Sequence, residues 1–128
     1  MTESTMEERS SKDQLELEIE RKHYARAALL AVSMDLLPAE EVGDLRRKAL
    51  WHISAVSRNA PGTSILGHEY GLTKEDVADY LRTKAKREQE SGAYKALEPC
   101  YDQMSGKYLA FDEWLEQLLK RWDKIGVP

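Results

Sequence analysis

The residues best suited to chemistry are two pairs of carboxylates, each spaced three positions apart in a predicted helix. Glu41 and Asp44 form one pair, and Asp76 and Asp79 form the other. Side chains at i and i+3 lie on the same face of a helix, so the members of each pair project together. Two such pairs facing each other could hold Mg²⁺, which takes carboxylate oxygens and bridges to substrate phosphates. In the other interpretation the acids complement helix N-termini, and the chain uses no cofactor.

Two segments around these acids resemble a known enzyme family. The first is Glu40–Leu45, followed by Leu50 and Trp51, and the second is Gly71–Val77. They resemble segments of the all-α MazG-type nucleoside triphosphate pyrophosphohydrolases. The resemblance implies Mg²⁺-dependent release of pyrophosphate from a nucleoside triphosphate. The chain departs from that family because Tyr24–Leu37, its preceding predicted helix, lacks a pair of glutamates.

A second alternative is a DNA-binding regulator. Gly71–Leu81 resembles the first helix of a bacterial helix-turn-helix. A recognition helix should follow after a short turn, whereas here the helical pattern continues without a break to Gln89. The net charge of −4 gives no general attraction for nucleic acid, so we do not expect a nucleic-acid partner. The basic residues that this alternative would use are Arg82, Lys84, Lys86 and Arg87.

Other catalytic patterns are missing from the sequence. Cys100 is the single cysteine, which excludes an intrachain disulfide and a zinc site built from cysteines. Glu20 and His23 have the E-x-x-H spacing of di-iron bundles, but such bundles need it twice, with two further carboxylates. There is no glycine-rich phosphate loop and no G-x-S-x-G motif. We therefore expect no catalytic residues.

The stretch Tyr24–Leu37 organises the predicted fold. It is apolar on nearly all sides, and such a helix is usually buried. It is too short to cross a bilayer and is interrupted by Arg26 and Asp35, so we expect no membrane insertion. The 41% hydrophobic and 33% charged content suits a small helical protein. The expected fold class is all-α: a small single-domain helical bundle of four to five helices around a buried central helix at about residues 24–37.

Signals along the chain place the other elements. Residues 1–11 are polar without periodicity and predict a disordered tail, which leaves residues 12–128 as one helical domain. Thr73–Asp76 resembles a capping box and predicts a helix that Gly92 ends. Ala93–Gly106 should form two short helical pieces because a proline divides it. From Phe111 to Ile125, large apolar residues recur at helical spacing and predict an amphipathic helix.

Asn59–Leu72 is the expected binding segment. It opens with the strongest helix-breaking residues in the chain and shows no clear period, so we expect a loop. A loop of this length in a small domain is uncommon unless it is functional or holds a short helical turn. Packing of Ile65 and Leu66 in the core is the alternative explanation for this segment. The candidate partner-binding residues are Trp51, which lies at the edge of the apolar face of its helix, and Ile65, Leu66, His68 and Tyr70.

These observations favour a small protein-interaction module over an enzyme. We expect an adaptor, accessory subunit or regulator that binds another protein or a second copy of itself as a homodimer. The N-terminal residues 1–14 have no apolar stretch of the signal-peptide kind and are too acidic for a transit peptide. The expected location is therefore cytoplasmic.

Overall fold

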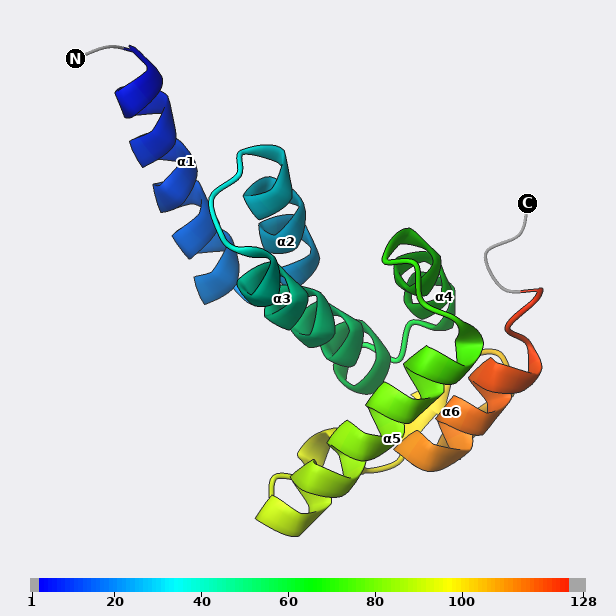
Figure 1. The fold of residues 1–128 in the computed structure, drawn as a ribbon. Helices are drawn as coiled ribbons and strands as arrows, with labels where there is room; N and C mark the ends of the chain where they lie inside the picture. Colours follow the sequence, from blue (N-terminus) through cyan, green and yellow to red (C-terminus); the bar gives the residue numbers. More distant parts are fainter. Residues whose placement is uncertain (1–2, 125–128) are drawn as a thin grey trace. The chain divides into compact units, whose positions relative to one another are not determined.

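The structure is a computed structural model that describes residues 3–124, with side chains from Ser10 onward. This part of the chain contains six α-helices, a π-helix, a 3-10 helix and one two-stranded antiparallel sheet (Figure 1). The prediction of an all-α protein is confirmed. Among the described residues, no helix is long and apolar enough to cross a membrane.

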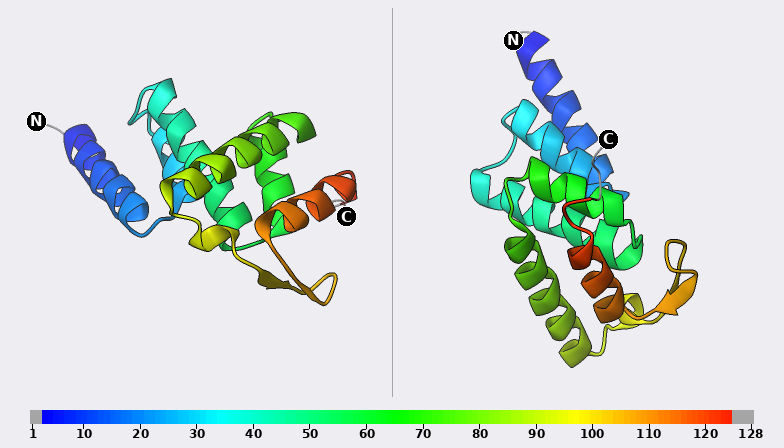
Figure 2. Two further views of the ribbon diagram at one scale, coloured as in Figure 1. Left: turned by 90° about the horizontal axis from the view of Figure 1, so that it is seen from below. Right: turned by 90° about the vertical axis from the view of Figure 1, so that its right-hand side faces the viewer.

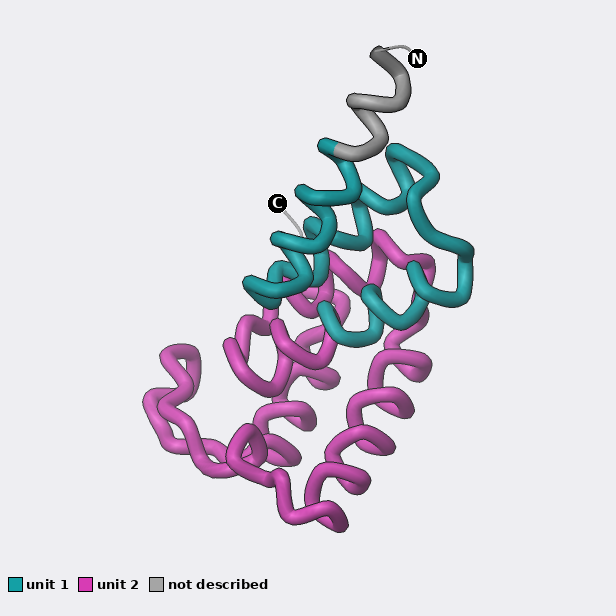
Figure 3. Tube along the Cα trace, turned by 90° about the vertical axis from the view of Figure 1, so that its left-hand side faces the viewer, with its two compact units in different colours: residues 1–49 teal, residues 50–128 magenta. Residues whose placement is uncertain are grey.

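The chain divides into two compact units, residues 1–49 and residues 50–128 (Figure 3). The division falls near the end of α3 (Ala39–Trp51), inside the range that the sequence predicts as a single domain. Each unit has buried apolar residues of its own.

The first unit is built from α1 (Glu3–Glu20), α2 (Tyr24–Ser33) and most of α3. The alanines of α2 are small enough to let neighbouring helices approach closely, and α1 packs beside α2. The buried cluster comprises Leu15, Ala27, Ala28, Ala31, Val42 and Leu45.

The prediction that α2 is buried on all sides is wrong for one of its faces. The helix buries Ala27, Ala28 and Ala31, whereas Leu29 is 62% exposed and Val32 and Met34 are also exposed. The helix also ends at Ser33, earlier than predicted, and Asp35 follows with a φ of 51° in the left-handed region. The physical reason is that the buried cluster engages one side of α2 only.

The first helix begins earlier than the sequence prediction placed it. α1 starts at Glu3, so most of the predicted tail of residues 1–11 belongs to a helix. No glycine or proline interrupts Glu3–Glu20, and its charged and polar residues are mostly acceptable helix formers. Residues 1–2 of the predicted tail lie outside the described residues.

The second unit holds the remaining elements. They are η1, a π-helix (His52–Val56), α4 (Ala60–Glu69), α5 (Lys74–Ser91), η2, a 3-10 helix (Lys95–Leu97), β1 (Cys100–Asp102), β2 (Lys107–Leu109) and α6 (Phe111–Lys120). The amphipathic helix starts at Phe111, as predicted, and ends at Lys120; Ile125 lies outside the described residues. Its buried residues are Phe111, Trp114, Leu115 and Leu118, and Trp122 just beyond it is also buried.

The predicted loop at Asn59–Leu72 is wrong, because most of it forms α4. The side chain of Asn59 accepts a hydrogen bond from the Gly62 N–H at 2.9 Å and caps the helix, and Pro61 lies in the first turn. These residues break a preceding helix, but they also favour the start of a new one. A Cβ at Gly67 would lie 3.0 Å from the ring of Trp122, so glycine allows α4 to pack closely there.

Of the two helical pieces predicted for Ala93–Gly106, the first exists as η2 and the second is wrong. The chain forms a hairpin instead, with Tyr101 directly opposite Tyr108. Pro99 holds the residue before it in an extended conformation, which prevents a helix from continuing. Gly106, with a φ of 71°, supplies the left-handed conformation in the turn between the strands.

A buried hydrogen bond joins η1 to α4. The hydroxyl groups of Ser54 and Thr63 lie 2.8 Å apart, and both residues are fully buried.

We expect Thr63→Val to lower the free energy of unfolding by about 1–3 kcal/mol, because the Ser54 hydroxyl loses its partner. The double variant Ser54→Ala with Thr63→Val should lose less free energy of unfolding than the sum of the losses in the two single variants. Urea unfolding of the four proteins measures this, and strictly additive losses would contradict the coupling.

Candidate functional site

The side chain of Arg58 donates four hydrogen bonds to backbone carbonyls of the second unit. The residue follows η1 with a φ of 50°, a left-handed conformation. Its Nε donates to the carbonyl of Ala55 at 3.1 Å and its Nη1 to that of Leu109 at 2.9 Å. Its Nη2 donates to the carbonyls of Ala96 at 3.0 Å and Glu98 at 2.9 Å. One guanidinium therefore joins η1, η2, the segment between η2 and β1, and the end of β2.

The environment of the guanidinium is partly apolar. Its central carbon lies 5.5 Å from the centre of the Phe111 ring, a cation–π distance. Burial lowers the pKa of Arg58. An arginine still keeps its proton at neutral pH, so all of its donors remain available to the carbonyls. The base of the hairpin is thus fixed to the helices by a charged side chain.

The hairpin presents large side chains outward. Tyr101 and Tyr108 are 56% and 71% exposed, and their rings meet edge to face with centroids 5.5 Å apart. Met104, in the turn between the strands, is 59% exposed. We call these three residues the hairpin surface. Within the second unit, the hairpin projects away from α6 and η2 (Figure 2).

A cavity lies beside the hairpin surface. It has a volume of about 550 Å³ and is lined by Ser57–Pro61 on one side and Tyr101–Met104 on the other. This volume falls within the range of about 300–1,000 Å³ that is usual for binding pockets. The hairpin surface and the cavity together offer exposed side chains next to a recess, which suits the binding of another protein.

The predicted binding residues of α4 have different environments. Ile65 is 55% exposed, whereas Leu66 is buried and Tyr70 is half-buried. His68 is exposed, although its ring stacks on Trp122 with centroids 5.5 Å apart. Ile65 is therefore the apolar residue of this group whose side chain is most available to a partner.

Trp51 is half-buried at the end of α3. Its ring meets Phe111 edge to face, with centroids 5.4 Å apart, and the ammonium group of Lys84 lies 5.8 Å from its ring centre. Trp51 thus helps to hold α6 and α5 while part of its ring stays accessible.

The helix-turn-helix pattern does not form at the predicted place. α5 is continuous over 18 residues from Lys74 to Ser91, so no turn separates its first half from the basic residues that follow. Its first turn carries Glu75 and Asp76, and Asp79 follows on the next turn. Negative charge at that end of a helix disfavours an approach to DNA phosphates.

The two predicted metal-binding pairs belong to different units. Glu41 and Asp44 lie in the first unit, where Asp44 forms an ion pair with Arg47. Asp76 and Asp79 lie in the second unit, and Asp76 is part of the helix cap described below. Among the described residues, no group of three or more histidine, cysteine, aspartate or glutamate residues is arranged to hold a metal ion.

Comparison of the chain with models of protein families, with curated proteins and with solved structures found no match. Function is therefore inferred from the chain's own residues. The features that bear on it are the hairpin surface, the cavity beside it and the contacts of Arg58.

The predicted capping box of α5 is confirmed and gives a pH-dependent contribution to stability. The Thr73 hydroxyl accepts from the Asp76 N–H at 3.1 Å, and the Asp76 carboxylate accepts from the Thr73 N–H at 3.0 Å. The hydrogen bond from the Thr73 backbone, and after it the Thr73 side chain, lower the pKa of the Asp76 carboxyl group. Because the pKa is lower in the folded state, the stabilisation is present above the ordinary carboxyl pKa of about 4 and is lost as the pH falls through the lower folded value.

We expect Asp76→Ala to be less stable than the unchanged protein at pH 7, with a difference that shrinks as the pH falls below about 4. Thermal unfolding measured at a series of pH values tests this. Thr73→Ala removes the hydroxyl but keeps the N–H that donates to the Asp76 carboxylate, so Asp76→Ala should keep most of its pH dependence in that background. Parallel pH profiles for the unchanged protein and Asp76→Ala would refute the assignment.

Proposed function

We propose that this chain is a small cytoplasmic protein-interaction module that acts as an adaptor, accessory subunit or regulator, without catalytic chemistry of its own. The observation that carries the proposal is the hairpin surface. Tyr101, Met104 and Tyr108 are all more than half exposed on one short hairpin. Clustered exposed side chains of this size are typical of binding sites.

The residue types suit an interface. Tyrosine and methionine are enriched in protein–protein interfaces, because they offer a large contact area and have few polar groups that need a hydrogen-bond partner. A tyrosine also loses little side-chain freedom on binding. The edge-to-face contact between Tyr101 and Tyr108 restricts both rings before a partner arrives. Such preorganisation reduces the entropic cost of association.

The base of the hairpin supports the same function. The hydrogen bonds of Arg58 to the carbonyls of Glu98 and Leu109 hold both ends of the hairpin. The cavity beside Tyr101 can receive a side chain from the partner. The partner is another protein or a second copy of this chain, and Ile65 on α4 is a candidate for an additional contact.

We expect the double variant Tyr101→Ser with Tyr108→Ser to keep its helical circular dichroism spectrum and to lose binding to its partner by at least about tenfold, or about 1.4 kcal/mol. Quantitative affinity capture from cells of the organism that makes the protein, with the tagged full chain as bait, measures this for proteins recovered in near-stoichiometric amounts. Analytical ultracentrifugation measures it for self-association.

The matched control is Leu29→Ser with Val32→Ser, which removes two exposed apolar side chains from the first unit. The control should retain the partners of the unchanged protein. Recovery of the same partners in the same amounts with the hairpin variant, together with unchanged self-association, would show that the hairpin surface is not the binding site.

A further inference from the structure

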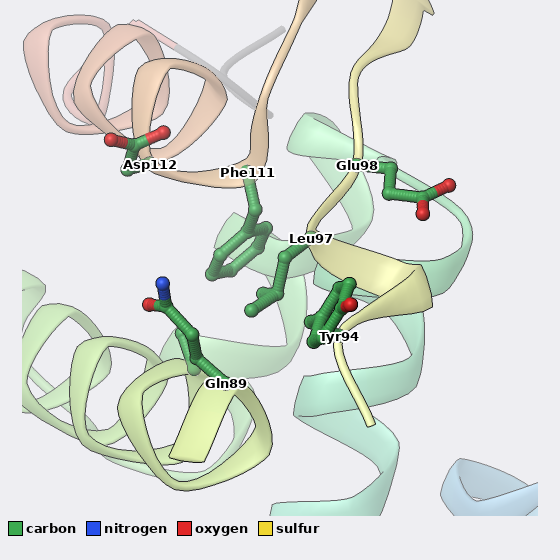
Figure 4. Close-up of a pocket in the computed structure, with 7 residues that line it drawn as sticks. Gln89, Tyr94, Leu97, Glu98, Phe111 and Asp112 are labelled. Carbon is green, nitrogen blue, oxygen red and sulfur yellow. The ribbon is translucent and has the colours of Figure 1, made fainter. Parts of the chain in front are cut away.

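A second pocket of the second unit lies where α5 ends, η2 passes and α6 begins (Figure 4). Its volume is about 390 Å³, within the usual range for binding pockets of about 300–1,000 Å³. It differs from the cavity beside the hairpin surface, with which it shares no lining residue. Its centre and its rim have different chemistry.

The centre of the pocket is mainly apolar. Figure 4 shows Tyr94, Leu97 and Phe111 converging on it, with the amide of Gln89 at its edge. Phe111 is buried and fixed by neighbouring rings, while Tyr94 is 52% exposed at the opening. A firm apolar wall with one accessible aromatic ring suits the insertion of a single apolar side chain.

The rim of the pocket is acidic. Figure 4 shows the carboxylates of Glu98 and Asp112 on opposite sides of the opening, directed away from the centre. Both residues are exposed, and none of the described residues that line the pocket is a lysine or an arginine. One Asp112 oxygen accepts the Glu113 N–H at 3.0 Å. Among the described residues, no ion pair to either rim carboxylate is found.

Arg58, whose guanidinium lies against the Phe111 ring, is already engaged. Arg58 lies over the Phe111 ring and gives its hydrogen bonds to backbone carbonyls, including that of Glu98. It is not among the residues that line the pocket. The rim carboxylates are therefore available to a positively charged ligand.

We propose that this pocket binds a partner peptide through one apolar side chain, with a lysine or arginine within two positions on either side. The apolar side chain would contact Leu97 and Phe111, and the basic side chains would reach Glu98 and Asp112. In an extended peptide neighbouring side chains point in alternate directions, and long basic side chains can span to opposite rims. The inference rests on the proposed function, because it states the chemistry of the partner.

The test is a selection of random peptides displayed on phage against the full-length protein, followed by fluorescence anisotropy titrations of the enriched peptides. Ala85→Phe partly fills the pocket. Glu98→Gln with Asp112→Asn removes both rim charges. The matched control, Asp79→Asn with Glu116→Gln, removes two exposed charges that do not line the pocket. Circular dichroism verifies the fold of each variant.

The expected result is enrichment of an apolar residue with lysine or arginine within two positions. The rim variant should weaken binding at least about tenfold at low salt, with a smaller effect at high salt, and the control should not. Ala85→Phe should also weaken it. A selection without basic residues, no enrichment at all, or equal binding to the rim and filled variants would overturn the inference. If the peptides lose binding to Tyr101→Ser with Tyr108→Ser instead, the proposed function stands and the pocket assignment fails.

Discussion

The guanidinium of Arg58 donates hydrogen bonds to the carbonyls of Ala55, Ala96, Glu98 and Leu109. The region it joins is short of regular structure, because η2 and both strands have three residues each. A two-stranded hairpin is marginal on its own in water. Arginine can stabilise it because its rigid fork carries five donors, more than any other side chain offers.

This arrangement links the stability of the second unit to its proposed binding role. Tyr101 and Tyr108 stay exposed, so they contribute little apolar burial to holding the hairpin in place. Their position depends instead on the hydrogen bonds at the hairpin base and on Leu109, which is buried beside it. The fold thus keeps the side chains of the hairpin surface exposed by anchoring the backbone beneath them.

The sequence predicts local features of this structure better than distant ones. The Thr73 capping box and the apolar face that starts at Phe111 follow from spacing within one helix, and both are present. The sequence predicts a loop in place of α4, because Asn59 can either end or begin a helix. The close packing of Gly67 against Trp122 favours the helix, and this contact is not visible in the local sequence. The role of Arg58 leaves no local pattern, since three of its hydrogen bonds reach carbonyls 38, 40 and 51 residues away.

The most direct measurement is amide hydrogen exchange by mass spectrometry on the full chain and on Arg58→Met, which keeps an apolar stem but removes the donors. Amides of residues 95–110 should exchange at least about tenfold faster in the variant, a loss of about 1.4 kcal/mol of local protection, while α1 and α2 keep theirs. Arg87→Met, a change at an exposed arginine of α5, should leave the pattern unchanged. Unaltered exchange at residues 95–110, or a uniform increase along the whole chain, would contradict the anchoring role of Arg58.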